Sequence, residues 1–193
     1  MESKKMLTKD QIDGAIAFHG HHCPGLTIGL RAAQWCLQNL GRAGDEDIVA
    51  VAETDMCADD AIQYLTGCTF GKGNFIFRDT GKAAFTFYRR SDNKRGRLVL
   101  NPDFAPDLQI RQEALSPDQK EELALLRQER TDRMMKADLN DLFIITVPDG
   151  EIPHRARIHK TVRCAICGEG VMEPRLQTVN GQKVCIDCAK KEK

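Results

Sequence analysis

The stretch His19-Gly20-His21-His22-Cys23-Pro24-Gly25 places three histidines and one cysteine within seven residues. The whole chain of 193 residues holds only five histidines, so metal-ligating side chains are concentrated here. If the stretch is extended, His19, His21 and Cys23 share one face. We therefore predict a metal site or a reactive thiol. Two other interpretations stay open, a turn of hydrogen-bonded histidines and a buried, inert Cys23.

A helix is expected directly after this stretch. Pro24 suits a first helical position, which puts Cys23 at the N-cap, where the positive end of the helix dipole favours a thiolate. Apolar residues then recur at helical spacing up to Gly41, a candidate residue for ending the helix: Leu26, Leu30, Ala33, Leu37 and Leu40. Cys36 lies close to this stripe and is interpreted as a core residue.

The remaining core elements are predicted from capping, periodicity and turn signals. Thr8 and Gln11 form a capping box before a short helix, and Ser116 with Gln119 begins a helix that runs to about residue 139. Strands are expected at 47–53, 74–79, 83–90, 97–101 and 142–147, with a short helix at 59–65. The pattern favours an α+β fold, with N-terminal helices and an antiparallel sheet in residues 1–153.

The tail carries the most specific spacing in the chain. Cys164 and Cys167 form one CxxC pair, and Cys185 and Cys188 form a second after a gap of 17 residues. Two such pairs supply the four thiolates of a tetrahedral zinc site. Residues 154–193 are therefore expected to form a small four-cysteine zinc finger, of zinc-ribbon or treble-clef type, stabilised by structural zinc.

Composition narrows the functional classes. The formal net charge is zero, which argues against binding to nucleic acid or membrane through a global field. From Glu151 onward, however, nine Lys and Arg face five Asp and Glu. No run of apolar residues is long enough for a membrane span, and the first ten residues do not resemble a secretory signal. We expect a cytoplasmic protein whose eight cysteines serve metal or redox chemistry rather than disulfides.

Further candidate residues follow the histidine stretch. Asp55, Cys57, Asp59, Asp60 and Cys68 could converge with it on a metal site that keeps an open position. The loop Gly71-Lys72-Gly73 could cradle an anion with its backbone N–H groups, although a plain turn before the next strand is the competing interpretation.

Three segments resemble the family of the E subunit of formylmethanofuran dehydrogenase. They are FHGHHCPGLTIGLRAA (18–33), ETDMCADDAIQYLTGCTFGKGNF (53–75), and RCAICGE (163–169) with CIDC (185–188). The family's histidine–cysteine motif falls on His19, His21 and Cys23, its further cysteines on Cys57 and Cys68, and its acidic position on Asp60. His22 stands where an apolar residue is expected.

The resemblance implies an α+β core with a zinc-finger tail, a cytoplasmic prokaryotic protein, and a homodimer. It does not imply dehydrogenase catalysis, because the chain is too short for the pterin and iron–sulfur centres of the named enzyme. A thin apolar stripe on the charged helix also suggests a second copy of the chain, and consists of Leu123, Leu126, Met134 and Leu139.

Three functional hypotheses follow. The first is a metal-binding accessory protein that holds a second transition metal, expected to be zinc, at His19, His21, Cys23, Cys57 and Cys68, with a tail that docks a partner protein. The second is an enzyme in which Cys23 is the nucleophile and Asp60 carries the proton. The third is a nucleic-acid or protein adaptor acting through the zinc finger, which the few aromatic residues there disfavour for nucleic acid.

Overall fold

The computed structural model describes residues 6–104 and 116–191. The chain divides into two compact units, Met1–Arg155 and Ala156–Lys193. Among the described residues, no helix is both long enough and apolar enough to cross a membrane.

Three helices of the first unit follow the local signals in the sequence. Helix α1 (Lys9–His19) begins at the expected capping box of Thr8 and Gln11, and α2 (Pro24–Asn39) begins at Cys23. Helix α3 spans Ala58–Thr66 and ends at Gly67. Gly41, directly after the C-cap of α2, has a φ of 90° and marks the end of that helix as expected.

The sheet of the first unit has five strands in the order β2-β1-β3-β4-β5. The strands are β1 (Ile48–Ala52), β2 (Phe75–Phe77), β3 (Ala84–Arg89), β4 (Arg95–Leu100) and β5 (Phe143–Thr146). Strands β1, β3, β4 and β5 pair antiparallel in that order. Helices and a mostly antiparallel sheet confirm the α+β class.

The sequence predicts an antiparallel meander of the strands expected at 74–79, 83–90 and 97–101, and this prediction is wrong for the first strand. Strand β2 pairs parallel to β1, not antiparallel to β3, with Val51 opposite Ile76. All five residues of β1 are buried, and a strand that is apolar on both faces is favoured in a central position. Strand β1 therefore lies between β2 and β3. The segment after β2 does not form the hairpin turn of a meander, and Thr80 N donates instead to Glu53 O, just after β1.

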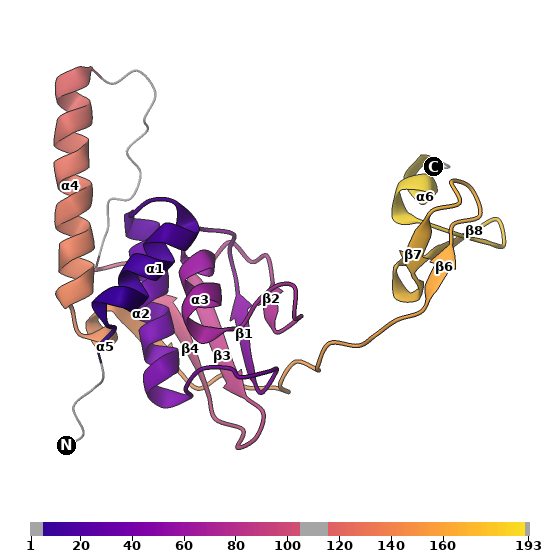
Figure 1. Ribbon diagram of the computed structural model, residues 1–193, viewed down its shortest axis with the longest axis horizontal. Coiled ribbons are helices and arrows are strands. Elements are labelled where there is room, and N and C mark those ends of the chain that lie inside the picture. Colours follow the sequence, from indigo (N-terminus) through magenta and orange to yellow (C-terminus); the bar gives the residue numbers. More distant parts are fainter. Residues whose placement is uncertain (1–5, 105–115, 192–193) are drawn as a thin grey trace. The chain divides into compact units, whose positions relative to one another are not determined.

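Helices and sheet enclose the main core (Figure 1). Ile48, Ala50 and Ala52 of β1 face the helices, as do Phe85 and Phe87 of β3, and all five belong to the main hydrophobic cluster. The alternate residues point to the opposite face of the sheet, where a smaller cluster forms around Val49, Val51 and Tyr88. On that second face Arg97 also donates to both carboxylate oxygens of Glu53, at 2.6 and 2.8 Å.

Helix α4 (Pro117–Lys136) packs against α2 and begins at the expected capping box of Ser116 and Gln119. The short helix α5 (Leu139–Leu142) connects it to β5. Met134 and Leu139 belong to the main core of the same chain, whereas Leu126 is 43% exposed. Part of the stripe assigned to a second copy is therefore covered within the chain, and the homodimer stays a prediction. The two prolines between Asn101 and Gln112 predict an irregular connection, of which residues 105–112 lie outside the described residues.

The second unit consists of two short hairpins and a terminal helix. Strand β6 (Thr161–Arg163) pairs with β7 (Gly170–Met172), and β8 (Gln177–Val179) pairs with β9 (Gln182–Val184). A 3-10 turn, η1 (Glu173–Arg175), lies between the hairpins, and α6 spans Ile186–Lys191. The hairpin turn at Asn180 and Gly181 uses positive φ at both residues, as the Asn-Gly signal indicates.

Candidate metal centres

The first unit gathers four ligands from three elements at one point. One donor atom from each of His19, His21, Cys23 and Cys57 lies within 4.8 Å of the other three. His19 ends α1, Cys23 caps α2, and Cys57 precedes α3, so the point lies where the ends of three helices meet. Two imidazoles and two thiols are a donor set that zinc prefers.

The histidine stretch is not extended throughout, contrary to the premise of its prediction. His19 is the last residue of α1, and Gly20 follows with a φ of 95°, a left-handed conformation that glycine adopts without strain. Cys23 is extended, with a φ of −146°. A turn, rather than strand alternation, brings the rings of His19 and His21 together, with their centroids 4.5 Å apart.

The two ring nitrogens of His19 have different surroundings. Its Nδ1 lies 2.7 Å from Asp60 Oδ2, while Nε2 is buried and has no hydrogen-bond partner among the described residues. An unpaired buried ring nitrogen costs free energy unless a ligand occupies it. Metal-binding histidines commonly use a carboxylate in this way to orient the ring. Asp60 thus fits an orienting role better than the proton-carrier role expected for it.

Close packing of α2 against α3 brings the two cysteines together. A Cβ on Gly29 would lie 2.2 Å from Ala58 O, so only glycine allows this approach of the two helices. The Cys23 sulfur accepts a hydrogen bond from Leu26 N at 3.3 Å. Burial and a hydrogen bond to Cys23 raise the pKa of the Cys57 thiol, which a metal ion would counteract by stabilising the thiolate.

Cys68 does not join this group, although the sequence suggested it as a ligand. Its side chain is fully buried in the core, and its sulfur donates to Ile48 O at 3.4 Å. Cys68 follows the C-terminal end of α3, whereas Cys57 lies at the N-terminal end, so the helix separates the two thiols. Cys36 is likewise buried and donates to Gly41 O, as expected for a core residue.

The loop Gly71-Lys72-Gly73 uses its backbone for its own turn. Gly73 N donates to Phe70 O and Lys72 N to Thr69 Oγ1, while Phe70 N donates to Gln63 Oε1. These N–H groups already have partners, which favours the plain turn over an anion cradle.

Two polar residues near the cluster are not ligands in this arrangement. Thr27 Oγ1 donates its single hydroxyl proton to Cys23 O at 3.0 Å. In its contact with His22 Nε2, 3.1 Å away, the same oxygen is therefore the acceptor and the imidazole is the donor. This bond fixes the tautomer of His22, and burial lowers the pKa of the His22 imidazole.

Burial also raises the pKa of the Asp59 carboxyl to about 7, and Asp59 Oδ1 has no partner in the described part of the chain. Asp55 is exposed.

A cavity of about 400 Å³ borders the four-ligand group on one side. One wall is the start of α2 with His21, His22 and Cys23, and the other is α4. The group is therefore accessible to a small molecule. Sequence reasoning did not assign any residue of α4 to the site.

The second unit gathers four cysteines in the same way. One sulfur from each of Cys164, Cys167, Cys185 and Cys188 lies within 4.8 Å of the others. Cys185 N donates to Cys164 Sγ at 3.3 Å, and this bond lowers the pKa of the Cys164 thiol to about 6. Neighbouring sulfur atoms instead raise the pKa of Cys188. Four thiolates so close together need a cation, and a zinc ion meets this need.

Both units match known families. Residues 18–144 match the family described as FmdE, Molybdenum formylmethanofuran dehydrogenase operon. Residues 159–193 match the prokaryotic dksA/traR C4-type zinc finger, which supports a structural zinc ion at the four cysteines.

Two individual proteins are similar over most of this chain. A probable S-adenosyl-L-methionine-binding protein of Archaeoglobus fulgidus is 30% identical over 190 residues, which cover 89% of this chain and 50% of that protein. The chain thus spans about half the length of this curated relative. A crystal structure from Syntrophus aciditrophicus, of a protein like the E subunit (FmdE) of tungsten formylmethanofuran dehydrogenase, has the same fold. Its TM-score is 0.66 and its identity 23%, with coverage of 99% of this chain and 98% of that chain. The chain therefore belongs to the FmdE family and carries a C4-type zinc finger at its C-terminal end.

Proposed function

We propose that this chain is a metal-binding accessory protein whose core site holds one divalent transition metal ion, with zinc as the expected ion. The observation that carries the proposal is His19: its Nε2 is buried and unpaired in the described part of the chain, beside three further donor atoms. Asp60 holds the opposite nitrogen of the same ring. The core ligands in this proposal are His19, His21, Cys23 and Cys57, without Cys68.

The chemistry of the donor set supports zinc. Two thiolates, from Cys23 and Cys57, would balance the two positive charges of the ion, and two neutral imidazoles would complete four protein ligands. A bound metal would supply a Lewis acid beside the cavity. The chain's own residues would orient His19 through Asp60 and keep Cys23 at the positive end of α2.

The tail would act as a docking module for a partner protein. Its charge is net positive, and it exposes large apolar side chains at Ile158, Ile166 and Met172. Such residues are common where a partner protein binds. The cysteines lie in two candidate ligand groups or in the core, as is common for proteins of the cytoplasm.

Catalysis at the core site is the second candidate, favoured by the cavity beside Cys23 and His21. In that case Cys23 or a metal-bound water would react with a small molecule. Turnover of a substrate would separate this candidate from the accessory role. Half of the archaeal relative lies outside the match, so its named ligand is not assigned to this chain.

Metal analysis of the purified full-length chain tests the proposal. We expect two zinc equivalents per chain after anaerobic reconstitution, and one after Cys57→Ser. The matched control is Cys68→Ser, which replaces a cysteine of the same unit that lies outside the group. The proposal is wrong if the wild type binds one equivalent, or if Cys57→Ser retains two.

A further inference from the structure

We propose that the cavity beside the core cluster binds a small oxyanion, a carboxylate or a phosphate, and that Arg127 of α4 is the residue that selects it. This inference rests on the proposed function, because the cluster's metal ion would form the opposite wall. It assigns a role to a helix that the metal cluster itself does not use.

One face of α4 lines the cavity at its open side. The lining residues of the helix follow the spacing i, i+3, i+4 and i+7, so they form a single stripe: Ala124, Arg127, Gln128 and Thr131. Thr131 is buried, whereas the other three residues are exposed to solvent. Ala124 and Thr131 are short and leave space, while Arg127 and Gln128 bring polar groups to it.

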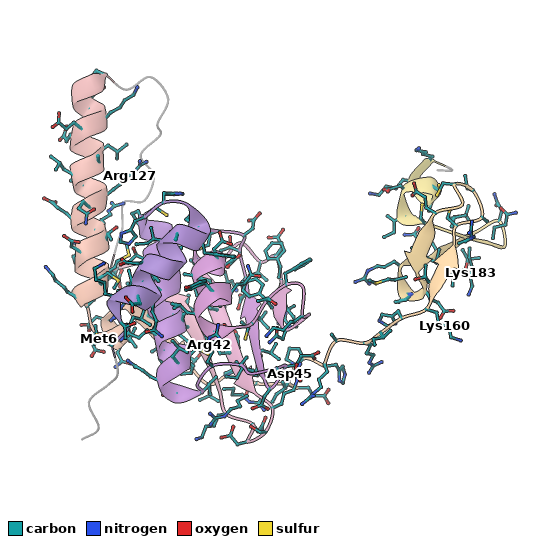
Figure 2. All side chains as sticks on the ribbon, in the orientation of Figure 1. Met6, Arg42, Asp45, Arg127, Lys160 and Lys183 are labelled. Carbon is teal, nitrogen blue, oxygen red and sulfur yellow. The ribbon has the colours of Figure 1, made fainter. Side chains whose placement is uncertain are left out.

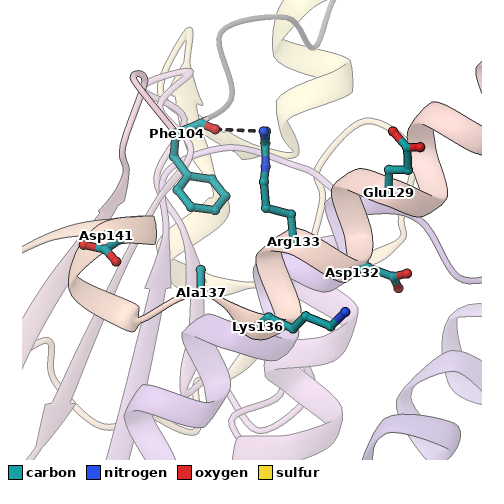
Figure 3. Close-up of a pocket in the computed structure, with 7 residues that line it drawn as sticks. All are labelled: Phe104, Glu129, Asp132, Arg133, Lys136, Ala137 and Asp141. Carbon is teal, nitrogen blue, oxygen red and sulfur yellow. Dashed lines mark hydrogen bonds between the residues drawn. The ribbon is translucent and has the colours of Figure 1, made fainter.

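Among the described residues, Arg127 has no partner for its guanidinium group, unlike Arg133 further along the same helix. Arg133 donates to Phe104 O at 3.1 Å and lies over the Phe104 ring, as Figure 3 shows. The side chain of Arg127 projects from α4 (Figure 2) and lines the cavity, but it makes no ion pair or hydrogen bond within the described residues. Its five N–H donors, in a planar fork, are suited to a carboxylate or phosphate.

The charges around the cavity favour an anion. Arg127 is the one Lys, Arg, Asp or Glu among the described residues that line the cavity. Asp132, outside the lining, accepts a hydrogen bond from Gln128 Nε2 at 2.9 Å, and its field acts on His22. Two thiolates would neutralise a divalent ion in the cluster, so Arg127 is the charge of the lining that remains uncompensated. The anionic group of the ligand would then bind the guanidinium, beside the metal cluster.

The cavity volume limits the ligand to a small molecule. About 400 Å³ lies at the lower end of the range of ligand pockets, which is roughly 300–1,000 Å³. The amide of Gln128 donates to Asp132, which leaves its oxygen as an acceptor for a hydroxyl or amine of the ligand. A hydroxycarboxylate or a small phosphate compound fits these requirements.

Calorimetric titration of the zinc-loaded full chain tests this inference, with inorganic phosphate and lactate as separate probes. Arg127→Met should weaken binding of the preferred probe at least about tenfold, because a charge-assisted hydrogen bond is lost. Arg127→Lys should retain part of the affinity as a point charge. Lys120→Met removes a positive charge from the same helix outside the cavity, and should bind like the wild type.

Metal content, measured on every sample, separates this inference from the proposed function. If the wild type holds a single zinc equivalent, the proposed function fails, and this inference fails with it. With two equivalents in both proteins, equal affinity of Arg127→Met and wild type overturns the role of Arg127 alone. Failure of the wild type to bind either probe at millimolar concentration overturns the oxyanion site. The probe that binds tighter identifies the ligand as carboxylate or phosphate.

Discussion

The two ligand groups of this chain differ in what surrounds them. In the second unit, the hydrophobic cluster has only four buried residues, Cys164, Val184, Cys188 and Ala189, and two of these are candidate ligands. In the first unit, two histidines and two cysteines lie at the edge of a large core and border a cavity. A small unit depends on its metal to fold, whereas a large core can fold first and then present a site.

Each group has four ligands, but their surroundings suit different roles. The tail group has four thiol ligands and matches a zinc-finger family, so a bound zinc ion would have a structural role. The core group mixes imidazole with thiol, keeps one histidine oriented by a carboxylate, and faces a space for a ligand. The predictions below are ordered from the largest expected effect to the smallest.

Cys185→Ser should have the largest effect and should be confined to the second unit. Removal of one thiolate leaves the unit without its metal, and its buried residues are too few to hold it folded. We expect loss of one zinc equivalent and loss of dispersed amide resonances for residues 161–191, with the core spectrum unchanged. Loss of the core resonances as well would show that the two units do not fold independently.

Gly29→Ala should destabilise the first unit without removing any ligand. The added Cβ would lie 2.5 Å from Ala58 Cα, so α2 and α3 must separate, which outweighs the better helix propensity of alanine. We expect a loss of about 1–3 kcal/mol in the free energy of unfolding in urea, with weaker metal binding at the core. Gly44→Ala is the control, because a Cβ there meets no atom within 4 Å. Equal stability of the two variants would contradict the role of this contact.

Asp60→Ala should weaken the core site and leave the tail site unchanged. Loss of the carboxylate bonded to His19 Nδ1 removes the group that orients the ring, which typically costs about 10- to 100-fold in metal affinity. Competition with a chromophoric zinc chelator would measure the metal affinity of the core site. Asp55→Ala removes a nearby, exposed carboxylate as the control. An unchanged metal affinity of the core site in Asp60→Ala would show that the Asp60 carboxylate is not needed to orient His19.

Local signals in the sequence were sufficient for much of this structure. Capping boxes at Thr8 and Ser116, the proline after Cys23, and the CxxC spacing each depend on neighbouring residues, and the elements they indicated are present. The parallel position of β2 was missed because strand pairing depends on burial across the whole sheet. A hairpin turn at residues 79–82 was equally compatible with the sequence.

The residues of the candidate core site show the same contrast between local signals and long-range contacts. His21 and Cys23 are near in sequence, so their proximity needed only a local turn, whereas Cys57 required the approach of α2 and α3 at Gly29. Cys68 was indistinguishable from Cys57 in sequence, and only its place beyond α3 removes it from the group. The stripe of Ala124, Arg127, Gln128 and Thr131 was present as a polar face at helical spacing, but nothing local indicated that it faces the cluster.

Anomalous diffraction at the zinc absorption edge, from crystals of the zinc-reconstituted full chain, tests the central claim most directly. The account predicts two anomalous peaks per chain. One should lie among Cys164, Cys167, Cys185 and Cys188, and the other within bonding distance of His19 Nε2, His21, Cys23 and Cys57. A single peak in the tail, with His19 Nε2 facing no metal, would contradict a metal centre in the core.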